Sequence, residues 1–194
     1  MKFSKILVSA AALIGLAACN QQPSPVSEEK FAEAVAKIEA HQYATAHADY
    51  DFSTKYTFKG FTAEEEAMYR EMGGMQDEQA KGSADFQWDG SVWTTNAADL
   101  PNGLAETIGT NIKDMPIEGA TAEGVKLYLN PFKVVENINM EQQGTKMSIN
   151  ATMVFDNYGY LTSMSGKQVM SASVAEGKTI SMTVVEKVTI SYAD

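Results

Sequence analysis

Few residues of this 194-residue chain have the types and spacing that metal binding requires. The candidates are His41, His47, Asp49 and Asp51, since imidazole and carboxylate groups are common metal ligands. The two histidines are six positions apart, whereas two ligands on one helix face are three or four apart, and the chain has no third histidine. We therefore expect solvated side chains at a junction between a helix and a strand, and no metal site.

Two glutamates interrupt the apolar pattern of predicted strands. Glu136 and Glu186 each lie between aliphatic residues two positions away on either side, so both fall on a face that is otherwise apolar. A carboxylate in apolar surroundings is costly unless it is paired, which indicates a functional position. The alternative is a strand end or a bulge, and the repeated valines Val184 and Val185 favour a bulge beside Glu186.

The chain lacks the sequence signatures of the common catalytic sites. It contains no nucleophile elbow, phosphate-binding loop, dinucleotide glycine pattern or zinc-binding helix motif. Both histidines lie near the predicted amino-terminal helix, which makes a serine–histidine–acid triad hard to build. Glu136 and Glu186 are the one candidate pair for carboxylate catalysis of the glycosidase type. We expect a protein that is not an enzyme and that needs no cofactor.

The single cysteine, Cys19, follows a segment with the pattern of a secretory signal. Residues 1–5 carry two lysines and no acid, residues 6–18 are almost wholly apolar or small, and the segment ends in Leu16-Ala17-Ala18. The apolar run is shorter than the roughly 20 residues that a membrane-spanning helix needs. The pattern predicts a signal peptide over residues 1–18.

The residues at 16–19, Leu-Ala-Ala-Cys, resemble the lipobox of bacterial lipoproteins. The resemblance implies cleavage before Cys19, attachment of diacylglycerol to its thiol, and an anchor on the outer face of the inner or outer membrane. Two or more acyl chains hold a protein stably at a membrane. The alternative is an ordinary signal followed by a chance cysteine, which leaves a free thiol in an oxidising compartment.

Composition limits the classes of partner. Residues 1–18 hold two of the 15 basic residues and no acid, so the remaining 176 residues hold 13 basic and 25 acidic residues, a net charge of −12. This charge argues against nucleic acid as a partner and against a domain that lies flat on anionic lipid. Arg70 is the only arginine, which limits a bidentate clamp for phosphate or carboxylate to one place.

Residues 19–26 are predicted to be a flexible tether, and residues 27–194 a single domain. Three helices are expected. The first, Ser27 to Gln42, is capped by Ser27; the second, Thr62 to Met72, has a capping box; the third, Asn102 to Met115, is ended by Pro116.

Period-two alternation predicts the strands. It runs over residues 49–59, over a hairpin at 84–96, and over a carboxyl-terminal meander at 126–130, 132–142, 146–155, 160–171 and 179–192. The predicted class is α+β, with a curved antiparallel sheet that forms an open half-barrel and two to three helices covering its concave face.

The lipobox, a helix, a long strand, intervening helices and a final meander resemble two related groups of lipoproteins. These are the carrier and receptor proteins of the Lol system (LolA and LolB) and the mycobacterial LppX and LprG type. The resemblance implies a half-barrel whose concave apolar face holds acyl chains. The Lol carriers use an arginine on an inner strand to tie down a lid; Arg70 lies in the predicted second helix, so that role is not carried over.

The candidate ligand-contacting residues share the apolar face of the predicted sheet or lie on the second helix. On the sheet they are Phe52, Tyr56, Phe58, Phe86, Trp88, Met140, Met147, Met153, Phe155, Met182 and Tyr192. Methionine-rich walls suit varied apolar ligands, although an ordinary packed core has the same pattern. Met68, Met72 and Met75 are either a lid hinged at Gly73-Gly74 or part of a helix docked on the sheet.

The sequence thus favours a membrane-anchored lipoprotein that binds a lipid or another apolar ligand as a carrier, chaperone or sensor. The alternative is a non-catalytic interaction or scaffold lipoprotein with a filled core, which uses its acidic surface or an open sheet edge to bind a protein partner.

Overall fold

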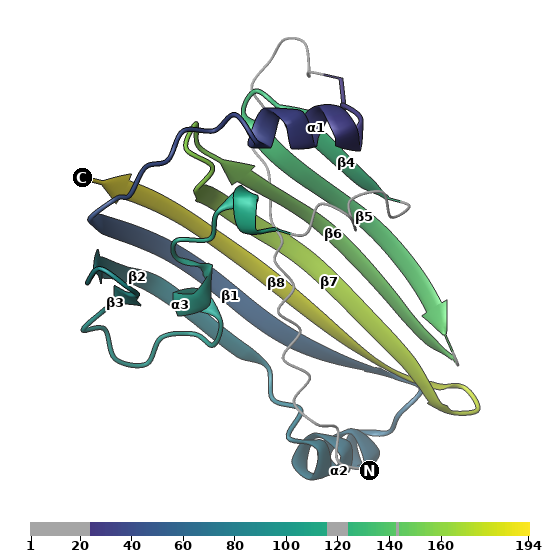
Figure 1. Cartoon of the computed structure of the whole chain (residues 1–194). Coiled ribbons are helices and arrows are strands. Elements are labelled where there is room, and N and C mark those ends of the chain that lie inside the picture. The colour runs from purple at the N-terminus through teal and green to yellow at the C-terminus, as the bar shows by residue number, and fades with distance from the viewer. Residues whose placement is uncertain (1–23, 116–123, 143) are drawn as a thin grey trace.

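A computed structural model describes residues 24–115, 124–142 and 144–194. One antiparallel sheet of eight strands, in the order β3-β2-β1-β8-β7-β6-β5-β4, dominates it and stays open (Figure 1). The strands are β1 (Thr45–Lys59), β2 (Glu78–Trp88), β3 (Trp93–Thr94), β4 (Val125–Leu129), β5 (Phe132–Gln142), β6 (Thr145–Phe155), β7 (Leu161–Ala175) and β8 (Lys178–Ala193). The predicted α+β class with one open antiparallel sheet is confirmed.

The helical elements of the described chain are short: α1 (Glu28–Val35), α2 (Ala63–Gly73), α3 (Leu104–Thr107) and the 3-10 turn η1 (Ile112–Asp114). None of them is long and apolar enough to cross a membrane.

The first strand lies beside the last. β1 pairs with β8 in unbroken register from Thr45 opposite Ala193 to Lys59 opposite Thr179. The carboxyl-terminal meander β4–β8 pairs in chain order, so the return of β1 joins the amino-terminal hairpin to it. The sequence predicted these strands, although β1 begins at Thr45 and not at 49, and β2 begins at Glu78 and not at 84. It did not predict this pairing, which depends on residues more than a hundred positions apart.

The second predicted helix is confirmed in detail. The Thr62 side chain accepts from the Glu65 N–H, and the Glu65 carboxylate accepts from the Thr62 N–H, which forms the expected capping box. Gly74 ends α2 in the left-handed region with φ 60°. All these interactions join residues close in sequence, which is why the sequence predicted them.

The first predicted helix is too long. The Ser27 hydroxyl caps it as expected, accepting from the Lys30 N–H, but the helix ends at Val35 and not near Gln42. Phe31 and Val35 are its buried residues, and Ile38 packs against the core from the turn that follows. The chain then crosses the end of the sheet to begin β1 at Thr45 (Figure 1).

The third predicted helix, over 102–115, is wrong, because the segment contains only the short helix α3 and the turn η1. Gly109 has φ +80°, and a Cβ on it would lie 2.1 Å from the Trp93 indole nitrogen. Asn111 bridges to Tyr160, and the Ile112 N–H donates to the Gly159 carbonyl. These bonds to the sheet replace helical ones. Leu104, Ile108 and Ile112, the apolar residues that suggested a helix, are all buried.

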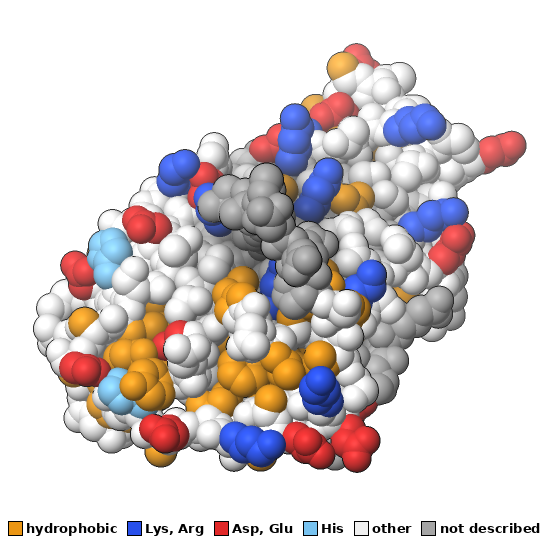
Figure 2. Space-filling view, turned by 90° about the horizontal axis from the view of Figure 1, so that it is seen from above, with side chains coloured by type: hydrophobic (Ala, Val, Ile, Leu, Met, Phe, Trp, Pro, Cys, Tyr) orange, Lys and Arg blue, Asp and Glu red, His pale blue; other side chains and the backbone are white. Residues whose placement is uncertain are grey.

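The hydrophobic core occupies one end of one face of the sheet. Phe31 and Val35 of α1, Leu104 of α3, Ile108 and Ile112 pack there against strand residues. Figure 1 shows α1 and α3 in front of this end and α2 at the opposite end, within the connection from β1 to β2. Seen from above, hydrophobic side chains gather in patches on one side of the molecule, among scattered charged residues (Figure 2).

Candidate functional site

The register of the sheet sorts its apolar face into rows. Residues directly opposite each other in antiparallel strands point to the same side, so a row can be followed from strand to strand. One row consists of Tyr50, Val188, Met164, Met153 and Val134. Its last four members are buried in the core. The half of the face containing this row is called here the packed half.

A second row is made almost wholly of methionine. It runs from Tyr56 on β1 through Met182 on β8, Met170 on β7 and Met147 on β6 to Met140 on β5. None of these four methionines belongs to the core cluster of the described residues. The methionine row lies toward the α2 end of the sheet, in what is called here the far half of the face.

Between the halves lies a row with two glutamates. It reads Phe52, Glu186, Gly166, Ala151 and Glu136 across the same five strands. The expected bulge beside Glu186 is absent, because β8 keeps its register with both neighbours there. Val185 points to the opposite face and is 40% exposed. Both glutamates therefore stand on the apolar face, and the smallest side chains of the row lie between them.

Burial shifts both glutamates toward the neutral form. It raises the pKa of Glu186 to about 7 and also raises the pKa of Glu136. Neither shift has a contribution from the other carboxyl group. Three strand spacings separate the two backbones, or about 14 Å. This arrangement differs from the coupled carboxylate pair of a glycosidase.

The sheet candidates divide between the two halves. Phe86, Met153 and Phe155 are buried in the packed half, each 2% exposed or less. Tyr192 and Trp93 pack against the same core, and the ring of Trp88, at the end of β2, lies 5.7 Å from that of Trp93. The remaining sheet candidates lie on the glutamate row or in the far half: Phe52, Tyr56, Phe58, Met140, Met147 and Met182.

Helix α2 is attached to the far end of β1 by Arg70. Its Nε donates to Glu66, its Nη1 donates to the Met75 carbonyl and to Asp77, and its Nη2 donates to the Tyr56 carbonyl. The guanidinium also lies 4.9 Å from the centre of the Phe58 ring. The only arginine of the chain therefore holds α2 in place at the end of β1.

The methionines of the α2 region differ in exposure. Met75 is buried, whereas Met68 is 49% and Met72 is 81% exposed. Glu65 at the start of the helix forms an ion pair with Lys178 of β8. The helix is thus docked at the end of the sheet, and a role for Met68 and Met72 in ligand contact stays a prediction.

The histidines do not come together. His47 lies on the opposite face of the sheet, where Asp85 accepts a hydrogen bond at 2.6 Å and raises the pKa of the imidazole. His41 contacts Asp194 at the end of the sheet. Within residues 24–115, 124–142 and 144–194, no three histidine, cysteine or acidic residues are grouped as metal ligands.

Sequence reasoning missed Met170, the member that joins Met182 to Met147. Its strand was predicted as a weak one over 160–171, yet Met164, Gln168 and Met170 alternate with period two on the apolar face. That alternation was the available signal. Cys19 and the signal segment lie outside the described residues.

Comparison of the chain with family models, with curated proteins and with solved structures finds no match.

Proposed function

We propose that this protein is a membrane-anchored lipoprotein whose far half of the apolar face binds an apolar ligand, such as an acyl chain of a lipid. The sheet then acts as a half-barrel, with α1 and α3 filling one end of its concave face and the ligand occupying the other. The observation that carries the proposal is the methionine row, which lies on the face of the core but outside the core cluster.

The physical properties of the row support this role. Methionine side chains are flexible and polarizable, so they adapt to apolar ligands of different shapes. Four strand spacings give the row a length of about 19 Å. Each methylene group buried there contributes about 0.8 kcal/mol, so eight of them favour binding by about 6 kcal/mol before the entropic cost of association.

The exposure of Met140 and the contact made by Gln168 favour a bound ligand over a filled core. Met140 is 49% exposed, so the row opens to solvent at β5. Gln168, 8% exposed, lies between the methionine and glutamate rows and donates to the Met147 sulfur at 3.1 Å. An acyl chain lying along the row would remove Met140 from water and leave the Gln168 bond intact.

A fluorescent apolar probe tests the proposal. N-phenyl-1-naphthylamine is titrated into the purified chain, with a fatty acid as competitor. We expect saturable binding that the double variant Met170→Gln/Met182→Gln weakens about tenfold, since it makes the centre of the row polar. The matched control is Met68→Gln/Met72→Gln. The proposal confines the ligand to the methionine row, so these two exposed methionines of α2, expected as ligand contacts from the sequence alone, fall outside it, and the control leaves the affinity within twofold. Equal loss in both variants, or no saturable binding, overturns the proposal.

A further inference from the structure

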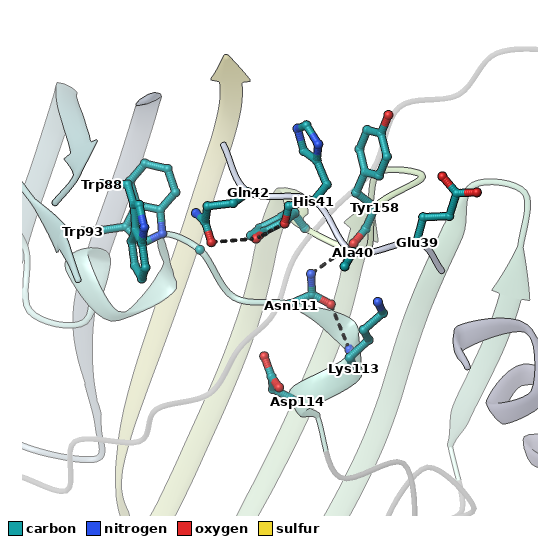
Figure 3. A pocket seen from close by; sticks show the side chains of 12 residues that line it. Glu39, Ala40, His41, Gln42, Trp88, Trp93, Asn111, Lys113, Asp114 and Tyr158 are labelled. Atoms are coloured by element: carbon teal, nitrogen blue, oxygen red, sulfur yellow. Dashed lines mark hydrogen bonds between the residues drawn. The ribbon is translucent and has the colours of Figure 1, made fainter. Parts of the chain in front are cut away.

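A pocket of about 350 Å³ lies at the packed end of the sheet, away from the far half. It forms where residues 39–42 cross the end of the sheet and meet the β2–β3 hairpin, the segment 109–114 and the turn before β7. Figure 3 shows Trp88 and Trp93 side by side at one end of it, with Asn111 and Asp114 across from them. Its volume is in the usual range for small-molecule sites.

Aromatic rings form much of the wall. The Trp88 and Trp93 rings are 5.7 Å apart, and the His41 ring stacks on Tyr158 at 4.2 Å. Tyr160 also lines the pocket and is 7% exposed. Tyr192 supports this wall from behind, 5.9 Å from Trp93 and 5.4 Å from Tyr160. The rings thus brace one another as a preformed surface.

The amides and the amine of the wall are already engaged. Asn111 donates to the Tyr158 carbonyl and accepts from the Lys113 N–H. Gln42 donates to the Tyr43 carbonyl and accepts from the Tyr160 hydroxyl. The Lys113 ammonium donates to the Ile38 carbonyl at 2.7 Å. These groups hold the loops together and leave few donors or acceptors for the hydroxyls of a sugar.

The carboxylates of Glu39 and Asp114 remain. Both are exposed, and neither has a hydrogen-bond or ion-pair partner among the residues that the structure describes. Burial, together with the charges of Asp156 and Asp114, raises the pKa of Tyr160, which places the Asp114 charge close to the aromatic wall. The Lys113 ammonium also lines the pocket and donates to a neutral carbonyl, so two carboxylates and one ammonium give the lining a net charge of −1. Aromatic faces beside a net negative charge attract organic cations, and tryptophan faces do so most strongly.

We propose that this pocket binds an alkylated ammonium ion of about the size of choline. The methyl groups would contact the indole and phenol faces, and the positive charge would be balanced by the exposed carboxylates of Asp114 and Glu39 in the lining. This ligand chemistry occurs both in free small cations and in lipid headgroups. The proposal is independent of the apolar site in the far half.

Tryptophan emission reports on this pocket directly, because the chain has two tryptophans and both line it. Choline chloride is titrated into the full chain, with sodium chloride as the ionic-strength control. The uncharged isostere 3,3-dimethylbutan-1-ol shows what the apolar contact contributes alone. We expect a saturable change of emission with choline and at least tenfold weaker binding of the alcohol. Equal binding of both, or no saturable change, overturns the proposal.

Charge-neutral variants test the carboxylates. Glu39→Gln/Asp114→Asn is expected to weaken choline binding at least fivefold and to leave the unfolding midpoint unchanged, since both side chains are exposed. The control Glu64→Gln/Glu71→Gln removes the same charge from α2 and is expected to have less than a twofold effect. If both variants weaken choline binding to a similar extent, the effect comes from net charge alone, and the proposed site is overturned.

Two further titrations separate the sources of the ligand. If phosphatidylcholine vesicles change the emission as choline does, the ligand is a lipid headgroup. If only choline changes it, the ligand is a free cation. Either result supports the site. A neutral disaccharide that gives a saturable response where choline gives none overturns the cation proposal.

Discussion

Glu186 on β8 and Glu136 on β5 stand in one row of the apolar face, with Gly166 and Ala151 between them. The row marks the boundary between the packed half, where Phe31 of α1 and Leu104 of α3 join the core, and the far half, where the methionine row lies. Two partly buried acids at such a boundary give the protein a stability that depends on pH.

We expect Glu186 to contribute most to the pH dependence of stability. Burial raises its pKa from 4.5 to about 7 in the folded chain. Between these values the folded state holds more protons than the unfolded state, so stability is fully present below pH 4.5 and falls as pH rises through about 7. Glu186→Gln removes this loss. After allowance for partial exposure, we expect the variant to be about 2 kcal/mol more stable than wild type at pH 8 and equal to it at pH 4.

Urea unfolding at several pH values measures this difference. Glu136→Gln is expected to act in the same direction, and Glu71→Gln, on the exposed surface of α2, gives the baseline. A stability difference between Glu186→Gln and wild type that is constant from pH 4 to pH 8 contradicts the burial of this carboxylate.

Arg70 is predicted to hold α2 on the sheet. Arg70→Lys keeps the charge but cannot donate at once to Glu66, Asp77 and the carbonyls of Tyr56 and Met75. We expect a loss of about 1–3 kcal/mol and faster amide hydrogen exchange in α2.

Lys81→Met is the control for Arg70, because the Lys81–Asp51 ion pair lies at the solvent-exposed surface, where an ion pair contributes little to stability. If α2 exchanges equally fast in wild type and Arg70→Lys, the arginine does not dock the helix.

Stability and ligand binding are predicted to map to different halves of the apolar face. Phe31, 1% exposed beneath α1, lies 6.0 Å from the Phe132 ring, so Phe31→Ala is expected to cost about 3–5 kcal/mol. Met140→Ala, at the open end of the methionine row, is expected to cost about 1 kcal/mol or less. Denaturant midpoints measure both. A cost for Met140→Ala comparable with that of Phe31→Ala shows that the far half is core.

The anchor is tested at Cys19. Cys19→Ser removes the thiol that the lipobox resemblance assigns to diacylglycerol, so the variant is expected to move from the detergent phase to the aqueous phase in Triton X-114 partitioning. Partitioning of wild type and variant into the same phase argues against lipid on this cysteine.

The sequence predicted features that depend on near neighbours. The alternation of Tyr50 to Phe58 placed their side chains on one face, and Thr62 with Glu65 located the start of α2. The end of α1 and the form of residues 104–114 depend on contacts with distant residues. Gly109 lies against Trp93, and Ile112 bonds to Gly159, so local spacing predicted a helix where the sheet imposes a bent chain.

The rows on the apolar face depend on register across several strands. Each methionine of the row was visible as an apolar position, but their alignment across β8, β7, β6 and β5 follows from three separate pairings. Alternation also predicted that Glu186 faces the apolar side, whereas the expected bulge assumed that two valines in succession break a strand. A regular strand accommodates them with Val185 facing outward.

Native mass spectrometry of the protein isolated from its own membranes tests the central claim most directly. The account predicts that the chain carries a non-covalent lipid-sized mass in addition to the lipid on Cys19, and that Met170→Gln/Met182→Gln reduces its occupancy while Met68→Gln/Met72→Gln does not. A chain that carries no such mass and that does not bind added apolar ligands contradicts the account.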